Sequence, residues 1–198
     1  MILVLWHLNL TKGECMCKIG LIGAGGCGST TVASIVSNEL NIKFIKSSDL
    51  TRNILKRDGY DYEPNSFVER FLADKKREFE LIDLRIVSEH QQDEFITDRT
   101  TLENYVYALD SIQNYSTDEL NVLHCKCWKN MKRYTHLFYL PRKDDIKDNK
   151  LRTLNIFYQR KIDYLIQSVL KDWGLKVIKL PKDIDKSVEI VLKEVKNV

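Results

Sequence analysis

The stretch KIGLIGAGGCGSTT, which runs from Lys18 to Thr31, decides the fold. It begins as a short apolar run, ends in glycines and continues into STTVASIVSNELN, where apolar side chains recur at helical spacing. A buried strand, a tight glycine-rich turn and a helix are therefore predicted in that order. In this context a glycine-rich turn can hold phosphate, because its backbone N–H groups and the positive end of the helix converge.

The turn matches one phosphate-binding pattern with a single departure. Gly23, Gly28 and Thr30 fit G-x-x-x-x-G-K-[ST], but Ser29 stands where the lysine belongs. The departure matters because this lysine normally neutralises charge between the last two phosphates. The residues that we expect around a bound polyphosphate are Gly23, Ala24, Gly25, Gly26, Cys27, Gly28, Ser29, Thr30 and Thr31.

The same glycines also fit G-x-G-x-x-G, the pattern of dinucleotide-binding turns. That pattern needs an acidic residue about 20 residues further on, at the end of the second strand. Asp49 meets the requirement roughly. The loop can therefore be interpreted as a dinucleotide site or as a nucleotide site. A purely structural glycine turn is a third interpretation.

Downstream of the turn, strand-like runs alternate with helical patterns to the end of the chain. The strand-like runs are IKFIKSS, EFITDRT, THLFYLP and LKVIKLP. The helical patterns include a short one that Gly59 stops, one long helix over residues 65–91, and one that Ser116 and Glu119 begin as a capping box. The alternation predicts an α/β fold of three layers, with a parallel sheet of about five strands between helices.

Ligands bind beyond the carboxyl ends of the strands in such sheets, and two polar motifs stand there. In the stretch ITDRTTLENYVYA, a predicted strand ends with Asp98 and Arg99. This stretch resembles the Asp-Arg element of nucleoside and nucleotide kinases. SDLTR resembles the E-x-x-R element of the nicotinamide riboside kinase group, with Asp49 in the glutamate position and Arg52 in the arginine position.

The stretch from Phe138 to Pro181 resembles the lid and final helix of the same relatives, with Arg152 and Arg160 at their two arginine positions. Together these stretches cover most of the chain from Lys18 to Pro181. The chain resembles the P-loop kinase-like ATPases of bacteria and their phages, which are related to nicotinamide riboside kinase domains and deoxynucleoside kinases. The resemblance implies one P-loop NTPase domain over residues 16–198, with a lid near residues 142–160.

The resemblance also implies ATP and Mg²⁺ as cofactors, and phosphoryl transfer to a nucleoside, a nucleotide or a related small metabolite. Thr30 and Asp98 would hold the magnesium ion. Asp49 would accept the proton of the acceptor hydroxyl, although an aspartate there could also cap the following helix. Arg52 and Arg99 would hold the acceptor or the transferred phosphate.

The two lid arginines have a further expected role. Arg152, as a catalytic residue, and Arg160, as an ATP-binding residue, would close over the nucleotide. One of them would supply the positive charge that Ser29 lacks. A nucleotide-binding module that no longer catalyses is the first alternative function, because Ser29 weakens the loop. An NAD-type dinucleotide-binding protein is the second.

Composition and the chain's beginning add weaker expectations. The net charge of +3 is too small to indicate nucleic acid as a partner, and it does not exclude one. Five unevenly spaced cysteines favour reduced thiols in a cytoplasm. The run MILVLWHLNL is shorter than the ~20 residues that span a bilayer, so we expect no membrane partner. Residues 1–15 are expected to be a non-native or disordered extension, with Met16 as the natural start.

Overall fold

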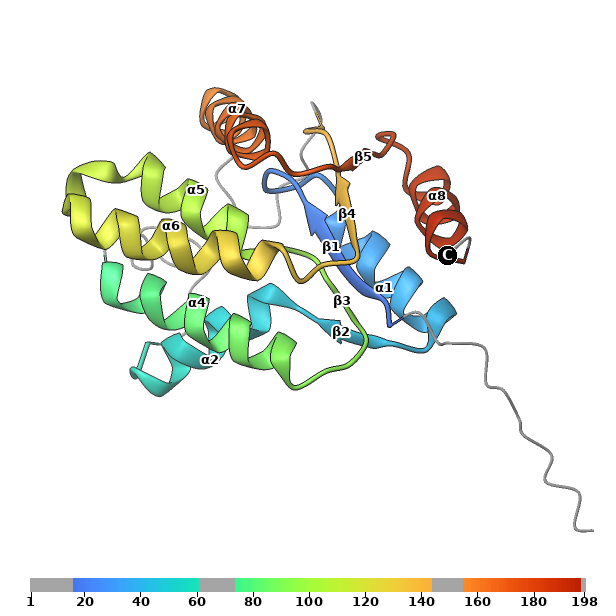
Figure 1. Cartoon of the computed structure of the whole chain (residues 1–198), viewed down its shortest axis with the longest axis horizontal. Helices are drawn as coiled ribbons and strands as arrows, with labels where there is room; N and C mark the ends of the chain where they lie inside the picture. The colour runs from blue at the N-terminus through green and yellow to red at the C-terminus, as the bar shows by residue number, and fades with distance from the viewer. Residues whose placement is uncertain (1–15, 61–73, 144–154, 197–198) are drawn as a thin grey trace, which may run out of the picture.

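The computed structural model describes residues 16–60, 74–143 and 155–196. All strands in these ranges join one parallel sheet in the order β2-β3-β1-β4-β5 (Figure 1). The strands are β1 (Lys18–Ile22), β2 (Lys43–Ile45), β3 (Phe95–Thr97), β4 (His136–Tyr139) and β5 (Ile178–Lys179). The sheet of about five parallel strands that the sequence predicts is thereby confirmed, with β1 at its centre.

Helices cover both faces of the sheet. They are α1 (Ser29–Leu40), α2 (Ser47–Arg57), α4 (Lys75–His90), α5 (Thr101–Asp110), α6 (Thr117–Met131), α7 (Ile156–Asp172) and α8 (Ile184–Lys196), with a short 3₁₀ turn at Ile112–Asn114. Figure 1 shows α1 and α8 on one side of the sheet, and α5 and α6 on the other. The three-layer arrangement therefore follows the alternation of strands and helices in the sequence.

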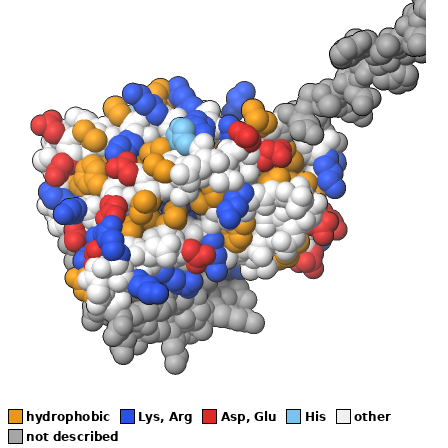
Figure 2. All heavy atoms as spheres, turned by 90° about the horizontal axis from the view of Figure 1, so that it is seen from below, with side chains coloured by type: hydrophobic (Ala, Val, Ile, Leu, Met, Phe, Trp, Pro, Cys, Tyr) orange, Lys and Arg blue, Asp and Glu red, His pale blue; other side chains and the backbone are white. Residues whose placement is uncertain are grey.

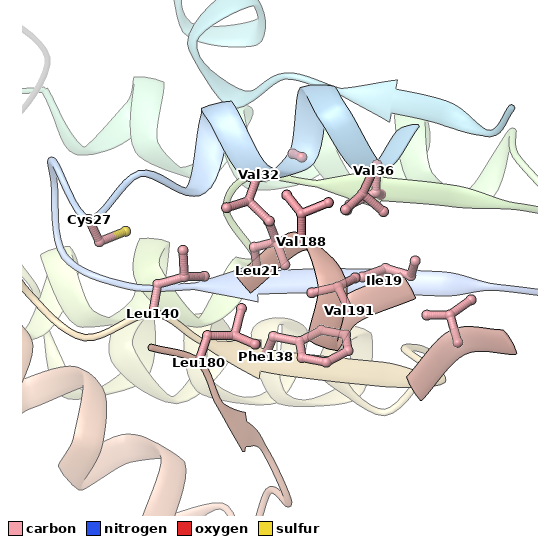
Figure 3. Close-up of a cluster of buried hydrophobic side chains, with 13 residues drawn as sticks. Ile19, Leu21, Cys27, Val32, Val36, Phe138, Leu140, Leu180, Val188 and Val191 are labelled. Atoms are coloured by element: carbon pink, nitrogen blue, oxygen red, sulfur yellow. The ribbon is translucent and has the colours of Figure 1, made fainter. Parts of the chain in front are cut away.

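The alternation of side chains along β1 and β4 divides the core between the two faces. Ile19 and Leu21 of β1 and Phe138 of β4 pack against Val32 of α1 and Val191 of α8 (Figure 3). The neighbouring positions on the same strands point the other way. Ile22, Leu137 and Tyr139 pack on α5, α6 and α7, in a cluster that also holds Leu102, Val106, Met131, Ile162 and Ile166.

One helix is shorter than the sequence pattern indicates. The prediction was a single helix over residues 65–91, but α4 begins at Lys75. Asp74 has extended backbone, with φ −122° and ψ 95°, and its carboxylate accepts a hydrogen bond from the Lys76 N–H at 2.9 Å. It therefore acts as an N-cap. Residues 61–73 lie outside the described residues.

The surface carries both signs of charge. Figure 2 shows one face on which Lys and Arg side chains are interspersed with Asp and Glu and with apolar side chains. Ion pairs such as that between Lys126 and Asp83 contribute to this pattern. Within the described ranges, every helix is too short or too polar to cross a membrane.

Polar side chains are buried where α4 packs on α5. The Glu78 carboxylate accepts a hydrogen bond from the Asn104 amide at 2.8 Å, and Arg85 donates to the other side of the same amide at 3.1 Å. Burial raises the pKa of Glu78 to about 7, although Asn104 and Arg85 oppose the shift. The buried surroundings of Glu78 therefore disfavour the ionised form of its carboxyl group.

Replacing Glu78 by glutamine should stabilise the protein at pH 8 and leave it almost unchanged at pH 5. The raised folded-state pKa means that the native chain binds more protons than the unfolded chain between about pH 4.5 and 7. The free energy of unfolding therefore falls as pH rises through this window. Removing the carboxylate should recover roughly 1–3 kcal/mol at pH 8. Urea unfolding of both proteins at the two pH values measures the difference, and an equal effect at both would contradict the assignment.

Candidate functional site

The glycine-rich loop connects β1 to α1 at the carboxyl edge of the sheet. Its interior bonds are few: the Cys27 N–H donates to the Ala24 carbonyl at 3.2 Å. Within the part of the chain that the structure describes, the N–H groups of Gly25, Gly26 and Gly28 donate to no protein acceptor. Unpaired amides at the start of a helix make a ready site for an anion.

Gly28 ends the loop in a conformation that needs glycine. Its φ is +102°, and it precedes the first residue of α1 as the N-cap. A Cβ atom at this position would lie 2.7 Å from Cδ1 of Ile184, the first residue of α8. The backbone angle therefore favours glycine, and a larger residue would also require the Ile184 side chain to shift. Ser29 follows at once and is 9% exposed.

Thr30 and Asp98 meet across the loop. The Thr30 hydroxyl donates to Oδ2 of Asp98 at 2.6 Å, although 68 residues separate the two in sequence. The other carboxylate oxygen accepts the backbone N–H of Ser47, the first residue of α2, at 2.9 Å. Asp98 is buried and follows β3, the neighbour of β1 in the sheet. One carboxylate thus joins the starts of α1 and α2 to the end of β3.

The Thr30–Asp98 pair fits the magnesium ion that a P-loop fold implies. A hydroxyl and a carboxylate are hard oxygen donors, which Mg²⁺ prefers. In nucleotide sites this ion is held by one or two carboxylates together with substrate phosphates. Two protein oxygens beside a loop with unpaired amides therefore form a suitable set.

Arg99 lies beside the glycine-rich loop, next to Gly25. Its Nη2 is 3.6 Å from the position that a Cβ atom would take on Gly25, and its Nη1 donates to the Tyr107 hydroxyl at 3.3 Å. The electrostatic interaction with Tyr107 raises the pKa of Arg99 against the effect of burial, so the guanidinium stays positive. Burial raises the pKa of the Cys27 thiol in the loop, which keeps it protonated. The loop therefore has a permanent cation and no thiolate beside it.

Glu103 fixes the first residue of the loop. Its Oε1 accepts the Gly23 N–H at 3.1 Å, while its Oε2 accepts the Thr100 N–H and hydroxyl. Thr100 and Glu103 form a capping box at the start of α5. The spacing T-x-x-E is a recognisable signal for that box. Our sequence analysis missed it, and the reach of the carboxylate to Gly23 has no sequence signal.

Arg85 is a second residue that the sequence analysis missed. The residue is 1% exposed, and its guanidinium donates to the Ser47 hydroxyl, the Arg99 carbonyl and the Asn104 side chain. Ser47 is the residue whose N–H binds Asp98. Arg85 therefore bonds to the two residues next to Asp98: the side chain of Ser47, whose N–H Asp98 accepts, and the carbonyl of Arg99, which follows Asp98 in sequence.

Asp49 and Arg52 pair with each other at the start of α2. Their side chains are 3.1 Å apart, and Asp49 also lies 4.0 Å from Lys46. The Asp49 side chain is 54% exposed. It does not cap the helix, because α2 begins two residues earlier with Lys46 as its N-cap. It stands in the first turn, where a negative charge interacts favourably with the helix dipole.

The lid residues divide between described and undescribed parts of the chain. Arg152 lies outside the described residues. Arg160 is exposed on α7, with its guanidinium carbon 6.0 Å from the Phe157 ring centroid. Its neighbour Gln159 is buried, and its amide lies 3.5 Å from the position of a Cβ atom on Gly25. Helix α7 therefore presents Gln159, and not Arg160, to the loop.

Comparison with known families agrees with this geometry. A family model described as an AAA domain matches residues 18–186. The chain belongs to this AAA domain family. The resemblance to P-loop kinase-like ATPases is thereby confirmed, and no curated protein matches this AAA domain chain.

Several solved structures share the fold. A deoxyadenosine kinase from M. mycoides, with the products dCMP and dCDP, is 16% identical with a TM-score of 0.63, and the match covers 91% of this chain and 100% of that one. NadR in complex with NR is 14% identical with a TM-score of 0.68, and the match covers 92% of this chain and 52% of NadR. Shikimate kinase from Acinetobacter baumannii with shikimate is 14% identical with a TM-score of 0.56, and the match covers 93% and 96%.

Proposed function

We propose that this AAA domain protein is an ATP-dependent phosphotransferase that acts on a nucleoside, a nucleotide or a related small metabolite. The observation that carries the proposal is the 2.6 Å bond between Thr30 and Asp98 beside a loop with unpaired amides. The similar structures support it, since they include a deoxyadenosine kinase and a shikimate kinase in complex with shikimate.

Phosphoryl transfer needs positioning and charge neutralisation more than covalent chemistry from the protein. The amides of Gly25, Gly26 and Gly28 would bind phosphate oxygens together with the N-terminus of α1. Arg99 would add a fixed positive charge at the same loop. Thr30 and Asp98 would hold Mg²⁺, which supplies further neutralisation of the polyphosphate when it is bound.

The acceptor side of the site is a separate part of the proposal. Asp49 is exposed in the first turn of α2, two residues after the Ser47 N–H that binds Asp98. From there it would accept the proton of the acceptor hydroxyl, and Arg52 would hold the acceptor. Arg152, which lies outside the described residues, would close over ATP as part of a lid. A cytoplasmic location remains our proposal from the cysteine pattern.

A nucleotide-binding module without catalysis is the second candidate, and Ser29 favours it. The NAD-type alternative is disfavoured by the strand order. In the dinucleotide-binding fold, β2 lies next to β1, so that its terminal acidic residue reaches the bound ribose. Here β3 lies between β1 and β2, which separates the strand before Asp49 from the glycine loop.

A binding and turnover assay separates these functions. Titration calorimetry with ATP, ADP and NAD should show binding of ATP in preference to NAD. Incubation with ATP and Mg²⁺ should then form ADP only when one member of a panel of nucleosides, monophosphates and small hydroxylated metabolites is added. ATP binding without turnover on a broad panel would support the module instead, and failure to bind any triphosphate would refute both.

A further inference from the structure

The loop lacks a lysine at position 29, yet the structure brings another lysine to the same point. Lys143 is half-buried, and its Nζ lies 3.5 Å from the position that a Cβ atom would take on Gly28. Its Cε lies 3.8 Å from the same position. Gly28 directly precedes Ser29, so the ammonium stands beside the residue that replaces the lysine of the pattern.

The sheet order explains how a residue so distant in sequence reaches the loop. Strand β4 is the direct neighbour of β1, and the chain after it continues along the same edge. The Leu140 N–H donates to the Ile22 carbonyl at 2.8 Å, and the Leu140 carbonyl lies 2.7 Å from the position of a Cβ atom on Gly23. Lys143 follows three residues later. The backbone after β4 is thus held against the loop, and this fixes the point from which the Lys143 side chain extends.

The charges around Lys143 favour an anion. Lys143 lies beside Gly28, the N-cap of α1, where the helix dipole has its positive end. The unpaired amides of the loop lie at the same end of the helix. Across residues 16–60, 74–143 and 155–196, Lys143 is in no ion pair. An ammonium beside these positive groups is unfavourable by itself, and a bound polyphosphate would turn the same arrangement into an attractive one.

We propose that Lys143 binds the terminal phosphates of ATP in place of the lysine that Ser29 replaces. This inference rests on the proposed function and deepens it. It gives the missing charge to the segment after β4, where the sequence analysis gave it to Arg152 or Arg160. The loop of this protein would then bind polyphosphate with a lysine supplied from a neighbouring strand.

The test is the affinity of a Lys143→Ala variant for ATP, ADP and AMP, measured by titration calorimetry. The Kd for ATP should rise roughly tenfold to a hundredfold, the range expected for losing a hydrogen bond to a charged group. The effect on ADP should be smaller and that on AMP close to none, because the lysine of such loops reaches the β- and γ-phosphates. Lys179→Ala, which removes an exposed lysine from β5, is the control for net charge and should leave all three affinities unchanged.

A second variant tests whether the loss of affinity comes from the missing ammonium or from a change in structure. Adding Ser29→Lys to Lys143→Ala restores an ammonium at the loop and should recover most of the ATP affinity. The melting temperatures of all variants establish that they are folded. An ATP affinity that Lys143→Ala leaves unchanged overturns the inference while the proposed function stands. An equal loss for ATP and AMP also overturns it, as does an effect on the acceptor alone. Absence of triphosphate binding by the unaltered protein would instead defeat the proposed function.

Discussion

Under the proposed function, an Asp98→Asn variant is expected to lose phosphoryl transfer by roughly 10²–10³-fold in kcat/KM while remaining folded. Asparagine has almost the same size as aspartate, and its oxygen can still accept the Ser47 N–H that Asp98 accepts at 2.9 Å. Its amide nitrogen can face the Thr30 hydroxyl. The tie between β3 and α2 is therefore kept, while the negative charge that a magnesium ion requires is removed.

The measurement is kcat/KM for the acceptor found by the panel assay, taken over a range of Mg²⁺ concentrations. We expect the variant to need more Mg²⁺ and to stay slow at saturation. Asp93→Asn is the matched control, because Asp93 is an exposed aspartate in the turn before β3 and should behave as the unaltered protein. A variant with full activity and an unchanged Mg²⁺ requirement would exclude Asp98 from the metal site.

The fold could be predicted from local patterns because each element carries its own signal. A glycine run after an apolar strand marks the loop, and alternation marks the parallel sheet. The start of α4 could not be placed in the same way. The helical pattern continues through Asp74, and only the capping bond to Lys76 shows where the described helix begins. The strand order was equally hidden, because local patterns contain no information on which strands pair.

In the candidate site, too, local sequence patterns predicted only the residues that lie in recognisable motifs. Thr30 and Asp98 were predicted through motifs that stand at strand ends. Lys143 lies in the charged run RKDDIKDNK, where no local feature separates it from its neighbours. It comes close to Gly28 only because β4 pairs with β1. Arg85 was missed because charged positions on a helix are normally solvated, whereas this one is buried and bonds to Asn104 of α5.

An Arg85→Met variant should test how far this buried cation supports the site. Methionine fills similar space, but it leaves the Ser47 hydroxyl and the Asn104 oxygen without the donor that Arg85 supplies, while the Arg99 carbonyl keeps only the hydrogen bond from the Thr97 hydroxyl. Each buried unpaired group costs about 1–3 kcal/mol. The variant should therefore lose about 3–5 kcal/mol in free energy of unfolding, and its melting temperature should fall by about 10 °C.

The dependence of that loss on pH distinguishes an electrostatic role from a packing one. The positive charge of Arg85 opposes the rise in the pKa of Glu78, so it favours the ionised carboxylate. At pH 8 the variant therefore loses both the hydrogen bonds and this attraction, whereas at pH 5 the protonated Glu78 gains nothing from Arg85. Urea unfolding at both pH values should show the larger loss at pH 8. Lys126→Met, at the exposed pair with Asp83, should change stability by less than about 1 kcal/mol at either pH. An Arg85→Met loss equal at the two pH values would mean that Arg85 acts through its neutral hydrogen-bond partners alone.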